Sequence, residues 1–242
     1  MKKQDLIFAL VLIGIFLPFI VWDKAYAFLY DPRHGINTLY PLLTAFIKFA
    51  ILATLGELLG IRIQTGKYFK KDFGIIPHAV VWGFLGVFIK IAFVIFANGT
   101  VAFAEHILHI ENAAEQLAGP MSFNKVLIAF LISLFLNTMF APVFMTIHKI
   151  TDLHIAKYNG SLKSLITPIN VREIITTMDW DVQWSFVFKK TIPLFWIPAQ
   201  TINFLFPPQY RILNAAILGI VLGVILAIAN LKSKPQPEVV KG

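Results

Sequence analysis

Six long apolar segments dominate this sequence of 242 residues and limit what it can fold into. They cover residues 6–22, 41–60, 75–97, 123–147, 186–206 and 210–231. A helix needs about 20 mostly apolar residues to cross the roughly 30 Å hydrocarbon core of a bilayer. Helices are favoured over barrel strands because the segments do not alternate and because a helix satisfies its own backbone hydrogen bonds in lipid. The sequence therefore predicts an all-α integral membrane helix bundle with about six transmembrane helices.

The composition excludes a soluble domain. Hydrophobic residues make up 57% of the chain and charged residues 14%, against about 45–50% and about 25% in soluble domains. Because the chain has no cysteine, disulfides, thiolate metal sites and cysteine nucleophiles are excluded. The net charge of +8 comes from basic residues in short runs between the apolar segments, which is a topology signal. We therefore expect the lipid bilayer as a partner and no nucleic acid.

The basic residues also predict the orientation of the chain. Lys and Arg gather in residues 62–74 and 148–185, whereas residues 98–122 contain none. Lysines also precede the first apolar segment and follow the last one. Cytoplasmic connections carry an excess of Lys and Arg. The pattern predicts a multi-pass protein with both termini on the cytoplasm-like side.

The first segment partly imitates a signal peptide. Lys2 and Lys3 precede an apolar stretch, and residues 25–27 resemble an A-x-A cleavage site. Its apolar run is longer than the usual 7–15 or so residues of a signal-peptide core. We predict a retained N-terminal transmembrane helix over residues 1–24, a helix bundle over 25–231 and a disordered tail over 232–242. Cleavage of residues 1–27 stays open.

Several short motifs resemble one known family. Near the last segment the chain carries Trp196, Pro198, Gln200, Asn203, Phe204, Pro208 and Arg211, and earlier it carries Pro41, Thr44 and Gly56. Gly74, Pro77, His78 and Trp82 form a further element. Together they resemble the Mpv-seventeen and peroxisomal membrane protein two family, small multi-pass proteins of the mitochondrial inner membrane and the peroxisome. Glu57 stands where the family has Asp, and Leu136-Asn137 where it has Asp-Gln.

The resemblance implies a family-like core of about five helices, to which this chain adds an N-terminal span. It also implies a channel or pore for small hydrophilic metabolites. The opening Met1-Lys2-Lys3, without a Ser- and Arg-rich presequence, favours a bacterial plasma membrane, with the mitochondrial inner membrane or the peroxisome as the alternative. Homo-oligomerisation, gating and the identity of the solute stay open.

Lys48, Glu57 and Lys90 are the candidate functional residues among the ionisable groups of the predicted spans. Such groups cost about 2.5–3.5 kcal/mol each on insertion scales, so they should face the bundle interior, a watery cavity or one another. Lys48 and Glu57 fall on opposite faces of one helix at about 100° per residue. Glu57 is near the end of its helix, where a solvated terminus is the favoured interpretation. If it instead faces polar surroundings, it could lock a neighbouring helix, for example through Lys90 or Arg211. The two lysines fit either a water-filled path or structural ion pairs.

The amides Asn137, Gln200 and Asn203 complete the set of pore-lining or helix-locking candidates. Buried amides commonly form hydrogen bonds between membrane helices, so a structural role is favoured over a polar stripe that faces a central path. Gln200 and Asn203 should share one helical face because they are three residues apart.

No motif points to catalysis. Glu105, His106 and His109 are the closest approach to a metal-ligand cluster, but their spacing departs from H-E-x-x-H and lacks a third ligand. We therefore expect no enzyme, no metal and no cofactor. The resemblance implies a channel or pore, and the excess of Lys among the candidates favours small polar or anionic metabolites as its solutes. The alternative is a non-conducting scaffold or assembly factor in which the same residues only fasten helices together.

Overall fold

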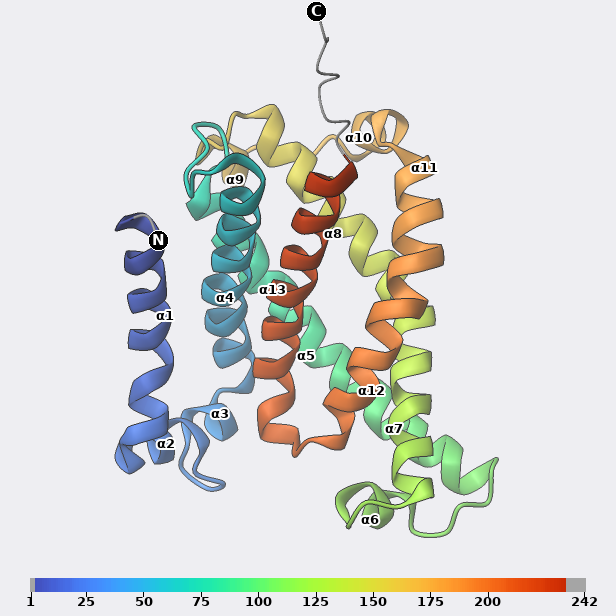
Figure 1. Cartoon of the computed structure of the whole chain (residues 1–242). Coiled ribbons are helices and arrows are strands. Elements are labelled where there is room, and N and C mark those ends of the chain that lie inside the picture. The colour runs from blue at the N-terminus through green and yellow to red at the C-terminus, as the bar shows by residue number, and fades with distance from the viewer. Residues whose placement is uncertain (1–2, 234–242) are drawn as a thin grey trace, which may run out of the picture.

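The computed structural model describes residues 3–233, with side chains to residue 228, and shows a bundle of helices (Figure 1). In chain order the elements are α1 Lys3–Val21, α2 Asp23–Tyr30, α3 Ile36–Leu39, α4 Pro41–Thr65, α5 Ile75–His106, α6 Ala113–Ala118, α7 Phe123–Phe135, the π-helix η1 Leu136–Phe140, α8 Ala141–Lys157, α9 Lys163–Ile166, α10 Val171–Thr177, α11 Trp180–Val182, the π-helix η2 Gln183–Trp196, α12 Ile197–Leu205 and α13 Pro208–Ser233. The described part of the chain contains no strand. The predicted all-α class is confirmed.

Five helices are long and apolar enough to cross a membrane. They are α1, α4, α5, the helix Phe123–Lys157 made of α7, η1 and α8, and α13. The sixth expected segment is helical too, but it is divided into η2 and α12 and carries Lys189 and Lys190. Pro193 and Pro198 lack a backbone N–H and interrupt the regular α-helical hydrogen bonds there. This segment still runs the height of the bundle between the labels α11 and α12 (Figure 1).

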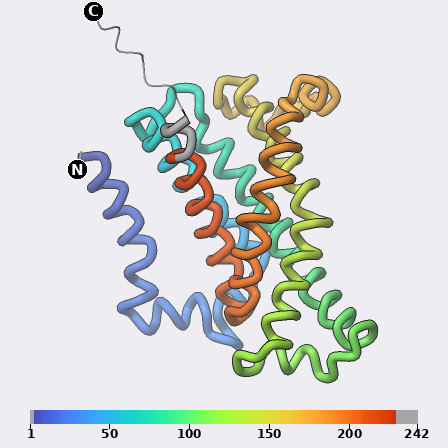
Figure 2. Tube along the Cα trace, turned by 45° about the vertical axis from the view of Figure 1, so that its right-hand side comes forward, coloured from blue at the N-terminus to red at the C-terminus, as the bar shows by residue number. Residues whose placement is uncertain are grey.

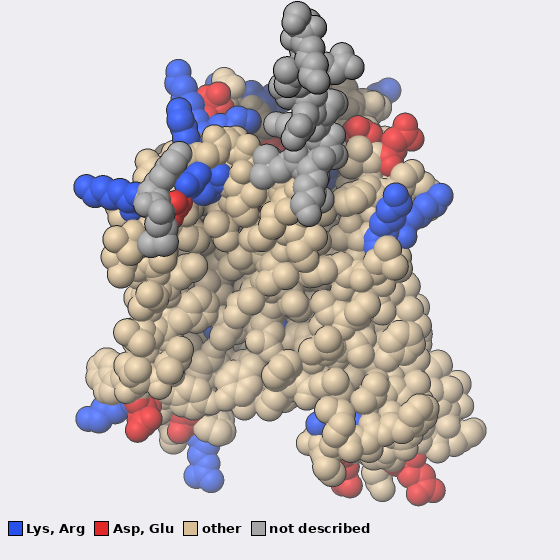
Figure 3. Space-filling view, in the orientation of Figure 1, with Lys and Arg blue, Asp and Glu red and all other residues tan. Residues whose placement is uncertain are grey.

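Both described ends of the chain lie at one end of the bundle, which we call the terminal end (Figure 1). The opposite end, the distal end, holds α2, α3, α6 and the turn between α12 and α13. Most of the Lys and Arg side chains visible in Figure 3 lie at the terminal end, above a broad band with few charged groups. The band fits the hydrocarbon layer. Of the tail predicted for residues 232–242, α13 includes Lys232 and Ser233, and the rest lies outside the described residues.

Helix α1 stands at the edge of the bundle (Figure 2) and buries none of its residues. Two contacts hold its first half to the rest of the chain. Asp5 accepts two hydrogen bonds from Arg62, at 2.7 and 2.9 Å, and the ring of Phe8 stacks on Tyr68 at 4.8 Å between centroids. The exposed apolar side chains of α1 are suited to contact with lipid.

The core of the bundle lies between α4, α5, α7, α12 and α13. Its most deeply buried side chains include Ala45, Phe49, Ile128, Ile132 and Phe204. Gly86 of α5 fits directly against Phe49 and Ala45 of α4. Small residues allow membrane helices to approach closely, and such packing drives their association in lipid. The tight α4–α5 pair is the scaffold from which the candidate site is built.

Candidate functional site

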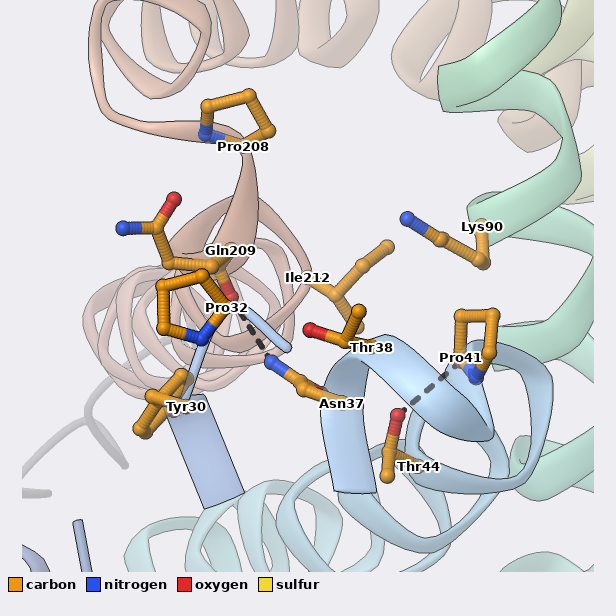
Figure 4. Close-up of a pocket in the computed structure, with 10 residues that line it drawn as sticks. All are labelled: Tyr30, Pro32, Asn37, Thr38, Pro41, Thr44, Lys90, Pro208, Gln209 and Ile212. Atoms are coloured by element: carbon orange, nitrogen blue, oxygen red, sulfur yellow. Dashed lines mark hydrogen bonds between the residues drawn. The ribbon is translucent and has the colours of Figure 1, made fainter. Parts of the chain in front are cut away.

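A cavity of about 330 Å³ opens at the distal end, where two helices begin with proline. Pro41 starts α4 and Pro208 starts α13, positions where the fixed φ of proline suits the first helical turn. The cavity is lined by Tyr30, Pro32, Asn37, Thr38, Pro41, Thr44, Lys90, Pro208, Gln209 and Ile212. In Figure 4 the side chain of Lys90 extends from α5 toward the residues of the other walls.

The connection before α4 forms one wall of the cavity and is fixed by its own polar contacts. Asp31 accepts hydrogen bonds from the backbone N–H groups of His34, at 2.6 Å, and Arg33, at 2.8 Å. These two bonds, that of His34 first, hold the pKa of the Asp31 carboxyl below its usual range. The amide of Asn37 donates to the carbonyl of Gln209 at 3.2 Å, a bond drawn in Figure 4. The wall is therefore tied to the start of α13.

Three tyrosines close the same wall. The hydroxyl groups of Tyr26 and Tyr210 are hydrogen-bonded, and the ring of Tyr30 lies 5.1 Å from that of Tyr26 and 5.3 Å from that of Tyr210. Burial, with smaller contributions from Tyr210 and Tyr26, raises the pKa of Tyr30 to about 12. Tyr30 thus stays a neutral phenol at physiological pH and adds no negative charge to the cavity.

Two lysines from the spans meet beside this cavity. The Lys48 ammonium donates to Asn37 Oδ1 at 2.7 Å and lies 5.1 Å from the centroid of the Tyr30 ring. It is close enough to Lys90 for the two positive charges to repel one another. Both lysines are half-buried. The structure therefore brings together the two cations that the sequence singled out.

Arg211 adds a third positive charge. It repels Lys90, and its guanidinium donates to the carbonyls of Phe206 at 2.9 Å and Phe204 at 3.0 Å, at the end of α12. Among the described residues no Asp or Glu forms an ion pair with Lys48, Lys90 or Arg211. Within the described part of the chain, the distal end thus holds three cations in the spans, of which Lys48 and Arg211 contact neutral groups.

Glu57 meets neither of the example partners, Lys90 and Arg211. Glu57 lies on the terminal side of the core, where its Oε1 is 3.9 Å from His148 Nε2, and it forms no ion pair with Lys90 or Arg211. Phe49, Leu52 and Ala53 are buried on α4 between Lys48 and Glu57. An apolar layer therefore separates the cationic cavity from the only carboxylate that the sequence places inside a predicted span.

The three predicted amides are buried but do not line the cavity. Asn203 donates to Gln200 Oε1 at 2.9 Å and to the carbonyl of Arg211 at 3.0 Å, which ties α12 to α13. Asn137 donates to the carbonyl of Ser133 at 2.9 Å, and the Ser133 hydroxyl donates to the carbonyl of Ile197 on α12 at 2.7 Å. Two of these contacts, Asn203 to Arg211 and Ser133 to Ile197, join neighbouring helices.

We predict that Asn203→Leu lowers the free energy of unfolding by about 1–2 kcal/mol, because Gln200 Oε1 and the Arg211 carbonyl lose their donor. SDS titration in mixed micelles, followed by circular dichroism, measures this change. Ile202→Val at the neighbouring, lipid-accessible position should change it by less than about 0.5 kcal/mol. An Asn203→Leu protein as stable as the parent would contradict this role.

Three of the family-like residues lie at the distal cavity, and others lie further along the bundle. Pro41, Thr44 and Pro208 line the cavity, and Thr44 donates to the Pro41 carbonyl at 3.1 Å. Trp196 and Pro198 lie at the junction of η2 and α12, whereas Gly56 faces Ile220 of α13 further along the bundle. The cavity also uses Tyr30, Asn37 and Gln209, which the sequence did not single out. The sequence signal for Tyr30 and Asn37 was the polar, tyrosine-rich connection that precedes the proline at the start of α4.

Glu105 and His109 line a second hollow, of about 470 Å³, together with Ile110, Glu111 and Asn112. His106 is not part of it.

No protein-family model, no curated protein sequence and no solved structure matches this chain. The resemblance to the Mpv-seventeen and peroxisomal membrane protein two family therefore rests on its motif residues alone.

Proposed function

We propose that the protein is a membrane channel or pore for small anionic metabolites, with the distal cavity as its solute-binding vestibule. The observation that carries this proposal is the group of three cations, Lys48, Lys90 and Arg211, without a carboxylate partner among the described residues. Each charge costs about 2.5–3.5 kcal/mol on insertion scales. A bound anion would offset part of that cost, and rings of basic side chains select anions in known pores.

The size and polarity of the cavity suit a small solute. Its volume of about 330 Å³ falls at the lower limit of the roughly 300–1,000 Å³ typical of ligand pockets. Asn37, Thr38 and Gln209 supply neutral polar groups around Lys90. These groups favour a compact carboxylate or phosphate over a large apolar ligand.

In this proposal the conformation described here is the closed state. Phe49, Leu52 and Phe93 are buried in the core beyond the cavity. Apolar constrictions gate pores by excluding water. Solute would bind at the distal end and cross when this apolar layer opens. Positive charge at the terminal end would place the cavity on the side facing away from the cytoplasm.

We predict that Lys48→Gln/Lys90→Gln lowers the anion-to-cation permeability ratio at least about tenfold. A unit charge about 4 Å away contributes on the order of 4 kcal/mol at a protein-surface dielectric, and about 1.4 kcal/mol already gives a factor of ten. Reversal potentials under a salt gradient in planar bilayers measure the ratio. Lys70→Gln, an exposed lysine of the 66–74 connection, is the matched control and should leave it unchanged.

The second candidate function is a non-conducting scaffold or assembly factor. The observation that favours it is that Asn203 and Ser133 use their side chains to bind neighbouring helices, Asn203 to α13 and Ser133 to α12. Polar groups used in this way stabilise helix packing and need no pore. The same recordings decide between the two functions. A well-folded protein without discrete conductance, or a selectivity that the double lysine variant leaves intact, would reject the anion pore and favour the scaffold.

A further inference from the structure

Four ionisable side chains that the proposed vestibule does not use meet near the terminal end of the bundle. Glu57 comes from α4, His78 from α5, and His148 and Asp152 from α8. Asp152 Oδ1 lies 3.5 Å from His148 Nε2 and 3.9 Å from His78 Nε2, and Glu57 Oε1 lies 3.9 Å from His148 Nε2. Donor atoms of Glu57, His78 and Asp152 all fall within 4.8 Å of one another.

These separations fit donor atoms around one metal ion. With bonds of about 2.0–2.1 Å, the ligand atoms of a tetrahedral zinc site lie roughly 3.3 Å apart. The closest observed pair is 3.5 Å apart and the next pairs 3.9 Å. Small side-chain rotations would bring these atoms to ligand distances. His148 and Asp152 also suit a shared ion because residues at i and i+4 face the same side of a helix.

The surroundings fix the histidine rings as they are fixed in metal sites. His78 Nδ1 lies 3.0 Å from the carbonyl of Gly74, which accepts a hydrogen bond when Nδ1 is protonated. The free lone pair of His78 is then on Nε2, the atom that faces Asp152. The ring of Phe73 stacks on His78 at 4.2 Å, and the ring of Trp82 lies 4.4 Å from that of His148.

Three polar atoms of this cluster lack a hydrogen-bond partner among the described residues, although the Trp82 indole also approaches the Glu57 carboxylate. Glu57 Oε2, His148 Nε2 and Asp152 Oδ1 are buried and form no hydrogen bond in the described structure. His78 is only 8% exposed. The two carboxylates repel one another, and no Lys or Arg of the described residues forms an ion pair with either. Buried groups of this kind are normally paired or bound to a metal, and a divalent cation would balance both carboxylates.

We propose that Glu57, His78, His148 and Asp152 form a binding site for a divalent first-row transition metal, with Zn²⁺ as the best-fitting ion. Imidazole and carboxylate ligands without thiolate suit such ions. The metal would link α4, α5 and α8 near the end of the bundle opposite the anion cavity. The site is independent of the proposed pore, because it shares no residue with the vestibule.

Zinc binding to the purified full chain tests this site directly. The protein, carrying a histidine-free tag, is stripped with a chelator in detergent, and Zn²⁺ is added in a calorimetric titration with elemental analysis of the product. We expect one ion per chain, with affinity lowered at least tenfold in Asp152→Asn and in His148→Gln. The control His106→Ala/His109→Ala removes two exposed histidines outside the cluster and should bind as the parent does.

X-ray absorption at the zinc edge of the unsubstituted protein identifies the ligands directly, so its result does not depend on whether a substituted protein folds. The site predicts about two imidazole nitrogens and two carboxylate oxygens at roughly 2.0–2.1 Å. The proposal is overturned by the absence of saturable binding, by a spectrum without imidazole, or by binding that only the His106/His109 control removes. None of these results bears on anion selectivity, which is measured separately.

Discussion

Gly86→Leu is expected to lower the free energy of unfolding by about 3 kcal/mol and to separate α4 from α5. A Cβ atom added at Gly86 would lie 2.5 Å from Phe49 Cβ and 2.8 Å from the carbonyl oxygen of Ala45. Both distances are too short for ordinary contact, so the backbone of α4 must move. Overpacking costs about 1–3 kcal/mol in well-packed cores. The upper part of that range is expected here because one of the obstructing atoms belongs to the backbone.

Gly99→Leu on the same helix is the matched control. Nothing outside the immediate chain lies within 4 Å of a Cβ built at Gly99, so a leucine there meets open space. SDS titration in mixed micelles, followed by circular dichroism, compares the two variants. Equal stability of the two variants would show that the α4–α5 contact is looser than described. The Gly86 variant should also disturb anion binding, because α4 carries Lys48.

The sequence predicted the membrane bundle well because hydropathy reports which segments prefer lipid. The apolar segments correspond to helices. Gln200 and Asn203 meet on one face of α12. All of these features depend on local periodicity alone.

The contacts between helices could not be predicted, because hydropathy does not tell which helices are neighbours. Lys90 and Arg211 were the example partners considered for Glu57, but α8 places His148 and Asp152 beside it. Those two residues follow the last apolar segment of that helix, and the basic composition of residues 148–185 indicated a connection. The structure instead continues α8 to Lys157. The spacing of His148 and Asp152 at i and i+4 was the available signal.

The ionisable side chains considered inside the bundle are thus divided along its length. Basic groups from α4, α5 and α13 meet beside the distal cavity, and carboxylates with histidines meet on the other side of the apolar core. Opposite charges kept apart in a low-dielectric bundle do not neutralise one another, so each group retains its attraction for an external ion. Stability alone would favour pairing Lys48 or Lys90 with Glu57. This separation is the physical reason for assigning ion binding to both ends.

Gly74→Ala is the second substitution with a large expected effect, about 3 kcal/mol of lost unfolding free energy. Gly74 precedes α5 with φ 70° and lies against the backbone of Gly160, which itself has φ 68°. A methyl group at Gly74 would meet the Gly160 backbone well inside contact distance. The substitution therefore combines an unfavourable backbone conformation with a direct clash between the 66–74 and 158–162 connections.

Gly66→Ala separates these two costs. Gly66 has a similar φ of 77°, but the nearest atom to an added Cβ is Arg62 Nη1 at 3.8 Å, so only the conformational cost of about 1 kcal/mol remains. The difference between the two variants in an SDS titration measures the Gly74–Gly160 contact. Because the Gly74 carbonyl also orients His78, Gly74→Ala should weaken Zn²⁺ binding, whereas Gly66→Ala should not. Equal losses in both variants would mean that the connections do not touch and that the ring of His78 is fixed by other contacts.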